Sequence, residues 1–206
     1  MAANVVILDY GSGNLRSAER AVARTGADVT VTSDLGADAE ADGLVVPGVG
    51  AYAACMAGIE ALNAGPVIAA RVAAGKPVLG ICVGMQILFE SGVEHGVVTK
   101  GLGLLPGSVT RLSAARIPHM GWNTVAVPEG SKLLAGIGAE ARFYFVHSYA
   151  AQDLDLLNDA LVTTASHDLP FAAVVEAGAL SAAQFHPEKS ADSGFALLGN
   201  WVATLA

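Results

Sequence analysis

The segment 76–89 constrains the fold of this chain more than any other, because an apolar run ends in Gly80-Ile81-Cys82-Val83-Gly84 and an amphipathic run follows at once. A Gly-x-nucleophile-x-Gly motif between a strand and a helix is typical of a nucleophile elbow, here with Cys in place of Ser. The tight turn needs glycines where a Cβ would collide, and the N-terminus of the following helix stabilises an anionic sulfur. The alternative is a buried structural cysteine between two glycines, because free Cys is often buried.

Strand-like and helical segments alternate up to the elbow. Apolar, β-branched runs predict strands at 5–8, 28–32, 43–46 and 77–81, and helical spacing predicts helices at 15–24, 52–62 and 67–74. The second half reads differently, with short strand-like segments, a hairpin connection at 177–179 and a closing helix at 194–205. These later strands are expected at 108–112, 124–127, 142–146, 160–165, 171–176 and 180–185. We therefore expect one α/β domain over residues 1–206, with a doubly wound, mostly parallel sheet, helices on both faces and a strand-rich second half.

Composition narrows the classes of function. The net charge of −8 weighs against nucleic acid as a partner, because phosphate binding needs clustered Lys and Arg. No apolar stretch approaches the roughly 18 residues that cross a bilayer, and the N-terminus lacks a basic region, so we expect no membrane segment, no signal peptide and a cytoplasmic protein. Cys55 and Cys82 are too few for a disulfide framework or a cysteine metal site, and we expect neither metal nor cofactor.

A cysteine nucleophile needs a base, and the base needs a group that orients it. Of the five histidines, only His186 ends a predicted strand with a carboxylate close by, in His186-Pro187-Glu188. Pro187 favours extended backbone before it, and residues two apart in an extended segment point the same way. Glu188 can therefore fix the tautomer of His186. The alternative is an ordinary surface turn.

Amide hydrolysis also needs donors for a developing oxyanion. The backbone N–H of Val83 follows the nucleophile, and Pro47-Gly48-Val49-Gly50 ends a neighbouring strand and can bring another N–H from Val49 or Gly50. The same stretch, continued to Ala53, also matches a dinucleotide fingerprint. That interpretation is weaker, because the stretch follows the third predicted strand and no Asp or Glu occurs at 68–74.

Several segments together resemble the class I (triad) glutamine amidotransferases, and one branch of that family in particular: the glutaminase subunits of imidazole glycerol phosphate synthase, in histidine biosynthesis. The resemblance runs from Asp9-Tyr10-Gly11 nearly to the end of the chain. The elbow and His186-Pro187-Glu188 are family-wide, whereas other segments separate the branch from its relatives. The branch-like segments are Pro47-Gly48-Val49-Gly50, Pro118-His119-Met120-Gly121-Trp122-Asn123, Phe145-Val146-His147-Ser148-Tyr149 and His186-Pro187-Glu188-Lys189-Ser190.

The resemblance implies that glutamine is hydrolysed through a thioester on Cys82, with His186 moving the proton and Glu188 orienting it. Glutamine would be bound by Gly48 and by four residues that match family positions: Gln86 and Glu94 for the α-amino group, Ser148 and Tyr149 for the carboxylate. Without the family, Gln86 reads as a solvated helix residue and Glu94 as a loop charge. Whether the Val49 N–H points inward from the start or turns only when a partner binds its ligand stays a hypothesis.

The resemblance also implies a partner, a cyclase subunit with a (β/α)₈ barrel that forms a heterodimer with this chain. It would use the ammonia to make imidazole glycerol phosphate and aminoimidazole carboxamide ribotide. Met120, Trp122, Asn123 and Lys189 match the docking face, although a strand Trp is often simply core. For His119 and His147, site support and packing both stay open, and His95, His167 and Cys55 are interpreted as structural or surface residues.

Three alternatives remain open from the sequence. A glutaminase of another amidotransferase system would use the same fold. A stand-alone cysteine hydrolase or a redox-sensing protein would use Cys82 but would not need Gln86, Glu94 or the Trp122 face. A non-catalytic binding module would keep the elbow only as a relic, and the intact set of Cys82, His186 and Glu188 argues against it.

Overall fold

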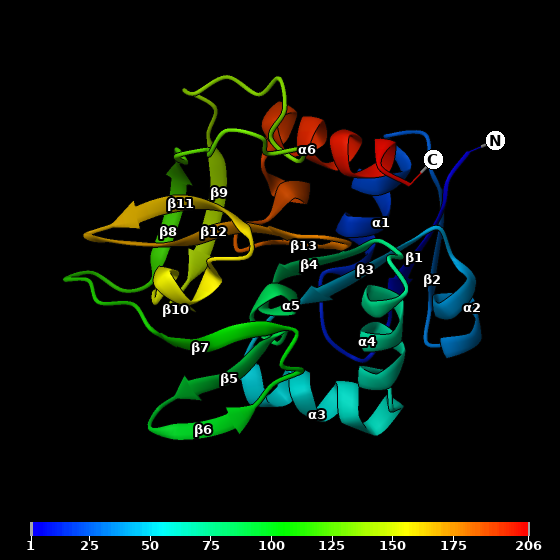
Figure 1. Cartoon of the computed structure of the whole chain (residues 1–206), viewed down its shortest axis with the longest axis horizontal. Helices are drawn as coiled ribbons and strands as arrows, with labels where there is room; N and C mark the ends of the chain where they lie inside the picture. The colour runs from blue at the N-terminus through cyan, green and yellow to red at the C-terminus, as the bar shows by residue number, and fades with distance from the viewer. Residues whose placement is uncertain (1, 206) are drawn as a thin grey trace.

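A seven-stranded sheet organises the computed structural model, which describes residues 2–205 (Figure 1). The strand order is β11-β12-β13-β4-β3-β1-β2. Strands β13 to β2 are parallel, and β12 and β11 extend that sheet as antiparallel hairpins. The strands are β1 (Asn4–Leu8), β2 (Asp28–Thr32), β3 (Gly43–Gly48), β4 (Val78–Cys82), β11 (Leu161–His167), β12 (Leu169–Ala177) and β13 (Leu180–Ala183). The expected doubly wound, mostly parallel sheet is confirmed.

Helices cover both faces of the sheet, as the alternation of the sequence predicts. Figure 1 shows α1 (Leu15–Ala23) and α6 (Ala191–Ala203) on one side, and α3 (Tyr52–Leu62), α4 (Gly65–Ala73) and α5 (Val83–Gln86) on the other. A short helix that the sequence did not predict, α2 (Leu35–Glu40), precedes β3. Strands β3 and β4 are buried along their whole length, because helices cover a parallel sheet on both faces.

The strands between the elbow and β11 form two smaller sheets beside the large one. One has the order β10-β7-β5-β6, built from β5 (Phe89–Glu94), β6 (Val97–Lys100), β7 (Leu105–Arg111) and β10 (Tyr149–Ala151). The other is an antiparallel pair, β8 (His119–Asn123) and β9 (Phe143–His147). Two short 3₁₀ turns are also present among the described residues: η1 (Leu154–Leu157) follows β10, and η2 (Pro187–Lys189) precedes α6.

Two sequence predictions are wrong in detail. The amphipathic run after the elbow forms only the single turn of α5, because the apolar residues Ile87, Leu88 and Phe89 are fully buried and carry the chain through the core into β5. Residues 124–127 were expected to form a strand, but the strand lies earlier, at β8. Only Ala126 makes an isolated bridge, to Thr164, and Pro128 follows, which cannot continue a ladder.

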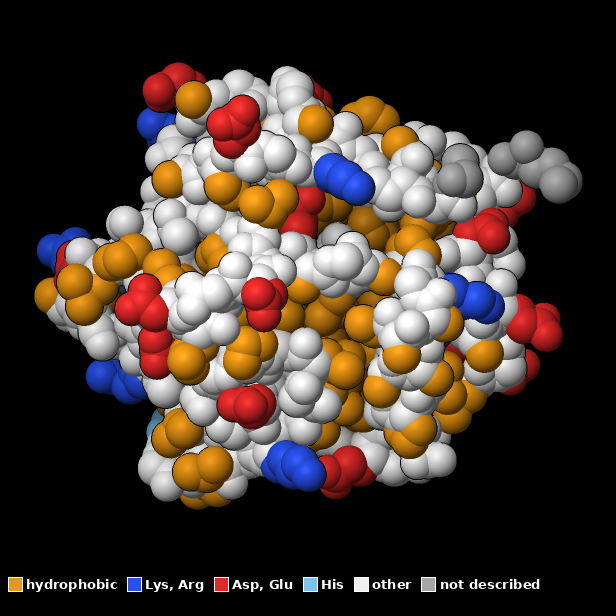
Figure 2. Space-filling model, in the orientation of Figure 1, with side chains coloured by type: hydrophobic (Ala, Val, Ile, Leu, Met, Phe, Trp, Pro, Cys, Tyr) orange, Lys and Arg blue, Asp and Glu red, His pale blue; other side chains and the backbone are white. Residues whose placement is uncertain are grey.

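Hydrophobic side chains gather in a hollow near the middle of the face shown in Figure 2, with acidic and basic side chains scattered singly around it. No single helix among residues 2–205 has the length and apolar character to cross a membrane, although the bent pair α3 and α4, at 85° to each other, passes on length and composition alone.

Candidate active site

Cys82 lies at the carboxyl end of β4 in a strained backbone conformation, with φ +57° and ψ −115°. Its register partner on the neighbouring strand is Gly48, the last residue of β3. A positive φ in a residue with a Cβ costs on the order of 1–3 kcal/mol and persists only where the surroundings impose it. The sequence motif therefore forms the sharp strand-to-helix turn that it predicts.

The flanking glycines are required by contact. A Cβ on Gly84 would overlap the carbonyl oxygen of Val46, and one on Gly80 would lie 2.7 Å from Leu88 Cδ1. A Cβ on Gly48 would lie 2.5 Å from the backbone nitrogen of Gly84, so the ends of β3 and α5 approach too closely for any side chain there. Gly48 thus shapes the elbow.

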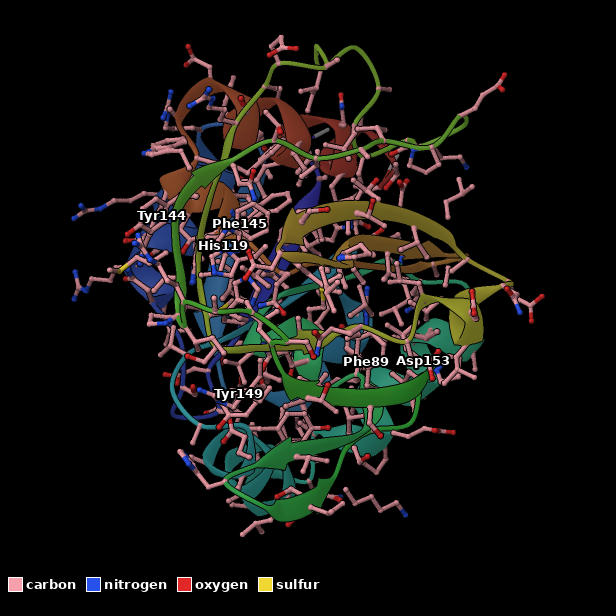
Figure 3. All side chains as sticks on the ribbon, turned by 90° about the vertical axis from the view of Figure 1, so that its left-hand side faces the viewer. Phe89, His119, Tyr144, Phe145, Tyr149 and Asp153 are labelled. Atoms are coloured by element: carbon pink, nitrogen blue, oxygen red, sulfur yellow. The ribbon has the colours of Figure 1, made fainter. Side chains whose placement is uncertain are left out.

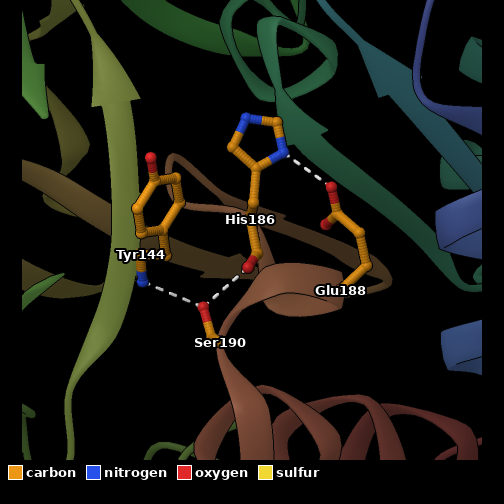
Figure 4. A network of polar contacts seen from close by, with 4 residues as sticks. All are labelled: Tyr144, His186, Glu188 and Ser190. Atoms are coloured by element: carbon orange, nitrogen blue, oxygen red, sulfur yellow. Dashed lines mark hydrogen bonds and ion pairs between the residues drawn. The ribbon is translucent and has the colours of Figure 1, made fainter. Parts of the chain in front are cut away.

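His186 and Glu188 form a buried pair (Figure 4). The Nδ1 atom of His186 lies 2.7 Å from Oε1 of Glu188, and each side chain is only 4% exposed. Because Nδ1 faces the carboxylate, Nε2 is the nitrogen left for Cys82. Burial by itself lowers the pKa of His186, but hydrogen bonds and charges from Cys82 and Glu188 outweigh it and raise that pKa to about 9.

The backbone that carries His186 is held by a residue to which sequence reasoning assigned no role. The Ser190 hydroxyl donates to the His186 carbonyl at 2.6 Å and accepts from the Tyr144 N–H at 3.0 Å (Figure 4). The His186 N–H donates to the Tyr144 carbonyl at 3.0 Å. Strand β9 and Ser190 therefore hold the backbone of His186, through a contact between residues 46 positions apart that no local motif reveals.

A cavity of about 440 Å³ opens between the elbow, the His186 turn and the end of β9. Small-molecule sites commonly have volumes of about 300–1,000 Å³. Its walls are Val49, Gly50, Cys82, Val83, Gln86, Glu94, Pro118, Val146, His147, Ser148, Tyr149, His186 and Lys189. The cavity thus collects all but one of the predicted oxyanion and substrate-binding residues; the exception is Gly48, which lies behind the elbow.

Gln86 and Glu94 both face this cavity with defined partners. Gln86 is buried rather than solvated, and its amide nitrogen donates to the carbonyl of Tyr149 at 2.9 Å and to Gln184 Oε1 at 3.0 Å. Glu94 ends strand β5 rather than lying in a loop, and its Oε2 accepts from the N–H of Tyr52 at 3.0 Å. The amide oxygen of Gln86 and the second oxygen of Glu94 are the acceptors left for a ligand.

The backbone of Val49 is held by Ser12, to which the sequence analysis gave no role, and by Cys55. Its N–H donates to the Ser12 hydroxyl at 3.2 Å, and its carbonyl accepts from that hydroxyl at 2.9 Å. The Cys55 thiol also donates to the Val49 carbonyl, at 3.4 Å, and lies 3.2 Å from the Ser12 oxygen. Cys55 is fully buried rather than at the surface, and its thiol contacts the loop after β3.

The residues of the predicted docking face are not all arranged alike. Met120 and Trp122 alternate along β8 and are 66% and 50% exposed, and the Trp122 ring packs edge-on against Tyr144. Lys189 lies at the cavity wall. Asn123 uses its amide inward, toward Ser166 and His119.

Comparison with known proteins identifies the family of this chain. The family model of the class-I glutamine amidotransferases matches residues 6–202. The chain is 63% identical, over 98% of each chain, to the imidazole glycerol phosphate synthase subunit HisH of Mycobacterium bovis, and 61% identical, over the full length of both, to that of Thermobifida fusca. The solved structure of PurLQS from Thermotoga maritima shares the fold, with a TM-score of 0.72 and 19% identity over 100% of both chains. The chain belongs to the class-I glutamine amidotransferases and, among them, to the HisH subunits of imidazole glycerol phosphate synthase.

Proposed function

We propose that this chain hydrolyses L-glutamine to glutamate and ammonia through a thioester on Cys82. The observation that carries the proposal is a strained cysteine that lines one cavity with His186, whose imidazole is paired with the buried carboxylate of Glu188. The Cys82 sulfur attacks the side-chain amide carbon of glutamine, and His186 holds the thiol proton. His186 then gives that proton to the departing nitrogen, which leaves as ammonia. Water, deprotonated by His186, attacks the thioester, and the thiol and glutamate are released.

Glu188 orients His186 and stabilises its protonated form, a role that its short contact to Nδ1 supports. The negative charge that develops on the amide carbonyl oxygen would be stabilised by the N–H of Val83 and by that of Val49 or Gly50. Since the Val49 N–H is bonded to Ser12, its use as a donor requires that peptide to turn. We infer that this turn makes glutamine hydrolysis conditional on the partner subunit.

The other wall residues suit the two ends of glutamine. An amide oxygen on Gln86 and a carboxylate on Glu94 are acceptors for the α-ammonium group, and backbone N–H groups at Ser148 and Tyr149 suit the α-carboxylate. Gly48 contributes by letting β3 approach the elbow closely. The whole chain would act as one glutaminase domain.

The partner would be a cyclase subunit with a (β/α)₈ barrel, joined to this chain in a heterodimer in the cytoplasm. It would receive the ammonia and form imidazole glycerol phosphate and aminoimidazole carboxamide ribotide. The names of the relatives, which are subunits, support a partner. Exposed Met120 and Trp122, with Asn123 and Lys189 beside them in sequence or at the cavity, form the proposed docking face, because an exposed aromatic on a strand suits an interface hot spot.

The proposal is tested with two cysteine variants in the complex with the cyclase subunit. Cys82→Ala is expected to release no ammonia from glutamine and to form no covalent adduct, whereas Cys55→Ala forms the adduct and keeps turnover. Mass spectrometry after trapping with labelled glutamine locates the adduct. Label on Cys55, or ammonia release by Cys82→Ala at the wild-type rate, contradicts the mechanism.

A further inference from the structure

Two buried histidines face each other across β8 and β9, outside the reacting groups described above. His119 and His147 are register partners, and Nδ1 of His119 lies 3.0 Å from Nε2 of His147. They pack among aromatic rings, with His167 stacked on His119 at 4.5 Å between ring centroids. Figure 3 shows His119 next to Phe145, with Tyr149 on the same side of the molecule.

The cavity end of this pair fixes the proton of His147. Its Nδ1 lies 3.0 Å from the carbonyl oxygen of Tyr149, which can only accept, so Nδ1 carries a proton. In a neutral imidazole the other nitrogen is then an acceptor. Nε2 of His147 therefore accepts, and the facing Nδ1 of His119 donates.

At the other end of the chain of hydrogen bonds, Asn123 independently fixes the same donor-to-acceptor direction. The side-chain oxygen of Asn123 accepts from the N–H of Thr124 at 2.9 Å, and its nitrogen donates to the carbonyl of Ser166 at 3.0 Å. These two backbone partners orient the amide, so its nitrogen faces Nε2 of His119 at 3.2 Å and donates to it. The hydrogen bonds run one way, from Asn123 through His119 and His147 to the carbonyl of Tyr149.

The pKa shifts of His119 and His147 agree with a neutral ring that carries one proton at each position. Burial lowers the pKa of His119 to about 4, with His167 acting in the same direction. Burial lowers the pKa of His147 to about 3; the carbonyl of Tyr149 opposes this, and the neighbouring rings of His119, His167 and His186 add to it. Both rings are therefore neutral at pH 7, and the charge that develops on His186 meets no second imidazolium across the cavity.

The two ends of the chain of bonds lie at different parts of the molecule. The carbonyl of Tyr149 accepts from Gln86 as well as from His147, and Gln86, His147, Ser148 and Tyr149 all line the cavity. At the other end, Asn123 closes the strand that exposes Met120 and Trp122. Beside the backbone ladder between β8 and β9, a continuous chain of side-chain hydrogen bonds thus joins the strand with the exposed face to the Tyr149 end of the cavity wall.

We propose that His119 and His147 are positioning residues whose one-way chain of hydrogen bonds fixes the Ser148–Tyr149 wall of the cavity and transmits to it the position of strand β8. The inference rests on the proposed function, because the ligand whose binding it tunes is glutamine. A residue that does not line the cavity, His119, then controls the affinity of the cavity, and a subunit bound on Met120 and Trp122 can adjust glutamine binding through it.

The tautomers are tested first, in the protein with ¹⁵N-labelled histidine. Long-range ¹H–¹⁵N spectra are expected to show both rings as neutral Nδ1–H tautomers from pH 6 to pH 8, which is a signature that packing alone does not predict. An Nε2–H tautomer on either ring, or a ring that titrates in that range, overturns the proposal whatever the enzyme does with glutamine.

Coupling is tested by glutamine kinetics in the complex with the cyclase subunit. His147→Phe keeps an aromatic ring but removes both bonds, and is expected to raise KM about tenfold with kcat within about threefold, the size of one buried hydrogen bond. His147→Asn keeps a donor near the position of Nδ1 and is expected to restore KM to within about threefold of wild type. Equal KM values for these two variants contradict the inference.

His119 supplies the decisive comparison. His119→Phe is expected to raise KM at least threefold although the side chain does not line the cavity, and His119→Asn, which keeps a donor toward His147, is expected to raise it less. His167→Phe, the matched change at a ring of the same cluster outside the chain of bonds, is expected to leave KM within twofold of wild type. An equal rise for His119→Phe and His167→Phe assigns the effect to packing and overturns the proposal. A wild-type complex without glutamine turnover refutes the proposed function, whereas the tautomer measurement still stands.

Discussion

The backbone N–H of Val49 donates to the hydroxyl of Ser12, 3.2 Å away, and the same hydroxyl donates back to the carbonyl of Val49 at 2.9 Å. The turn after β1 therefore holds the peptide group that follows β3. The N–H of Val49 belongs to the Gly48–Val49 peptide and its carbonyl to the next one, so the Ser12 hydroxyl holds two consecutive peptide groups. An N–H that is already engaged cannot also donate to an oxyanion, and the hydroxyl of Ser12 therefore opposes the turning of the Gly48–Val49 peptide toward the nucleophile.

Replacing Ser12 with alanine is expected to raise glutamine turnover by the subunit without its partner. The Val49 N–H then loses its acceptor, and one oxyanion donor is worth on the order of 2.7–4 kcal/mol in the transition state. We expect a rise of about tenfold, because only part of the peptide population turns. Ammonia release by the isolated subunit measures it.

The control is the same variant in the complex, where turnover should stay close to wild type because the peptide has already turned. Basal turnover of Ser12→Ala at or below the wild-type level would show that the hydroxyl of Ser12 does not restrain the donor.

The buried pair of His186 and Glu188 predicts a loss of stability in alkali. The pKa of His186 rises from its ordinary 6.5 to about 9 in the folded protein, since the hydrogen bonds and charges of Cys82 and Glu188 outweigh the opposing effect of burial. A group whose pKa is raised by folding stabilises the native state fully below its unfolded pKa, and this stabilisation is lost as pH rises through the folded pKa. The free energy of unfolding should therefore fall between pH 6.5 and pH 9.5, by roughly 3 kcal/mol at most from this group.

Urea unfolding at the two pH values measures this loss. Other groups titrate in the same range, so the informative quantity is the difference between wild type and Glu188→Gln, which removes one of the two stabilising charges. The variant should lose less stability between pH 6.5 and pH 9.5 than wild type does. An equal loss in both proteins rules out the pair as its source.

Two glycine-to-alanine changes, one in the elbow and one in helix α6, are expected to have opposite effects on stability. A methyl group on Gly84 would overlap the carbonyl oxygen of Val46, so Gly84→Ala must push β3 away from α5, and we expect a loss of several kcal/mol of stability together with most glutamine turnover. Gly199 lies inside helix α6 with open space around its missing Cβ. Gly199→Ala should stabilise the protein by about 0.5–1 kcal/mol without changing turnover.

Thermal unfolding and glutamine turnover of the two variants test this pair directly. A Gly84→Ala protein as stable and active as wild type would mean that the turn does not depend on close contact between β3 and α5.

The turn at Cys82 and the His186–Glu188 segment could be predicted from the sequence, because nearby glycines and proline determine their backbone. The glycines around Cys82 and the proline between His186 and Glu188 restrict the backbone within a few residues, so their geometry follows from the sequence alone. The mostly parallel sheet was predictable for a similar reason, because strands and helices alternate up to Cys82.

Contacts between distant segments could not be predicted in this way. Ser12, Val49 and Cys55 meet only because β1, β3 and α3 pack together, and Ser190 reaches Tyr144 only because η2 lies against β9. Residues 124–127 show how a short alternation misleads, since strand pairing went to His119–Asn123, whose partner β9 is available. Polar side chains that serve the backbone of another segment carry no periodic signal.

The left-handed backbone at Cys82 has a consequence for how such a chain changes under selection. Glycine is the one residue that adopts that conformation without strain, so a glycine there would relax the turn and remove the sulfur in the same step. Heat resistance and turnover therefore favour different residues at this one position, and a library screened only for survival at high temperature would be expected to discard the thiol among the first changes.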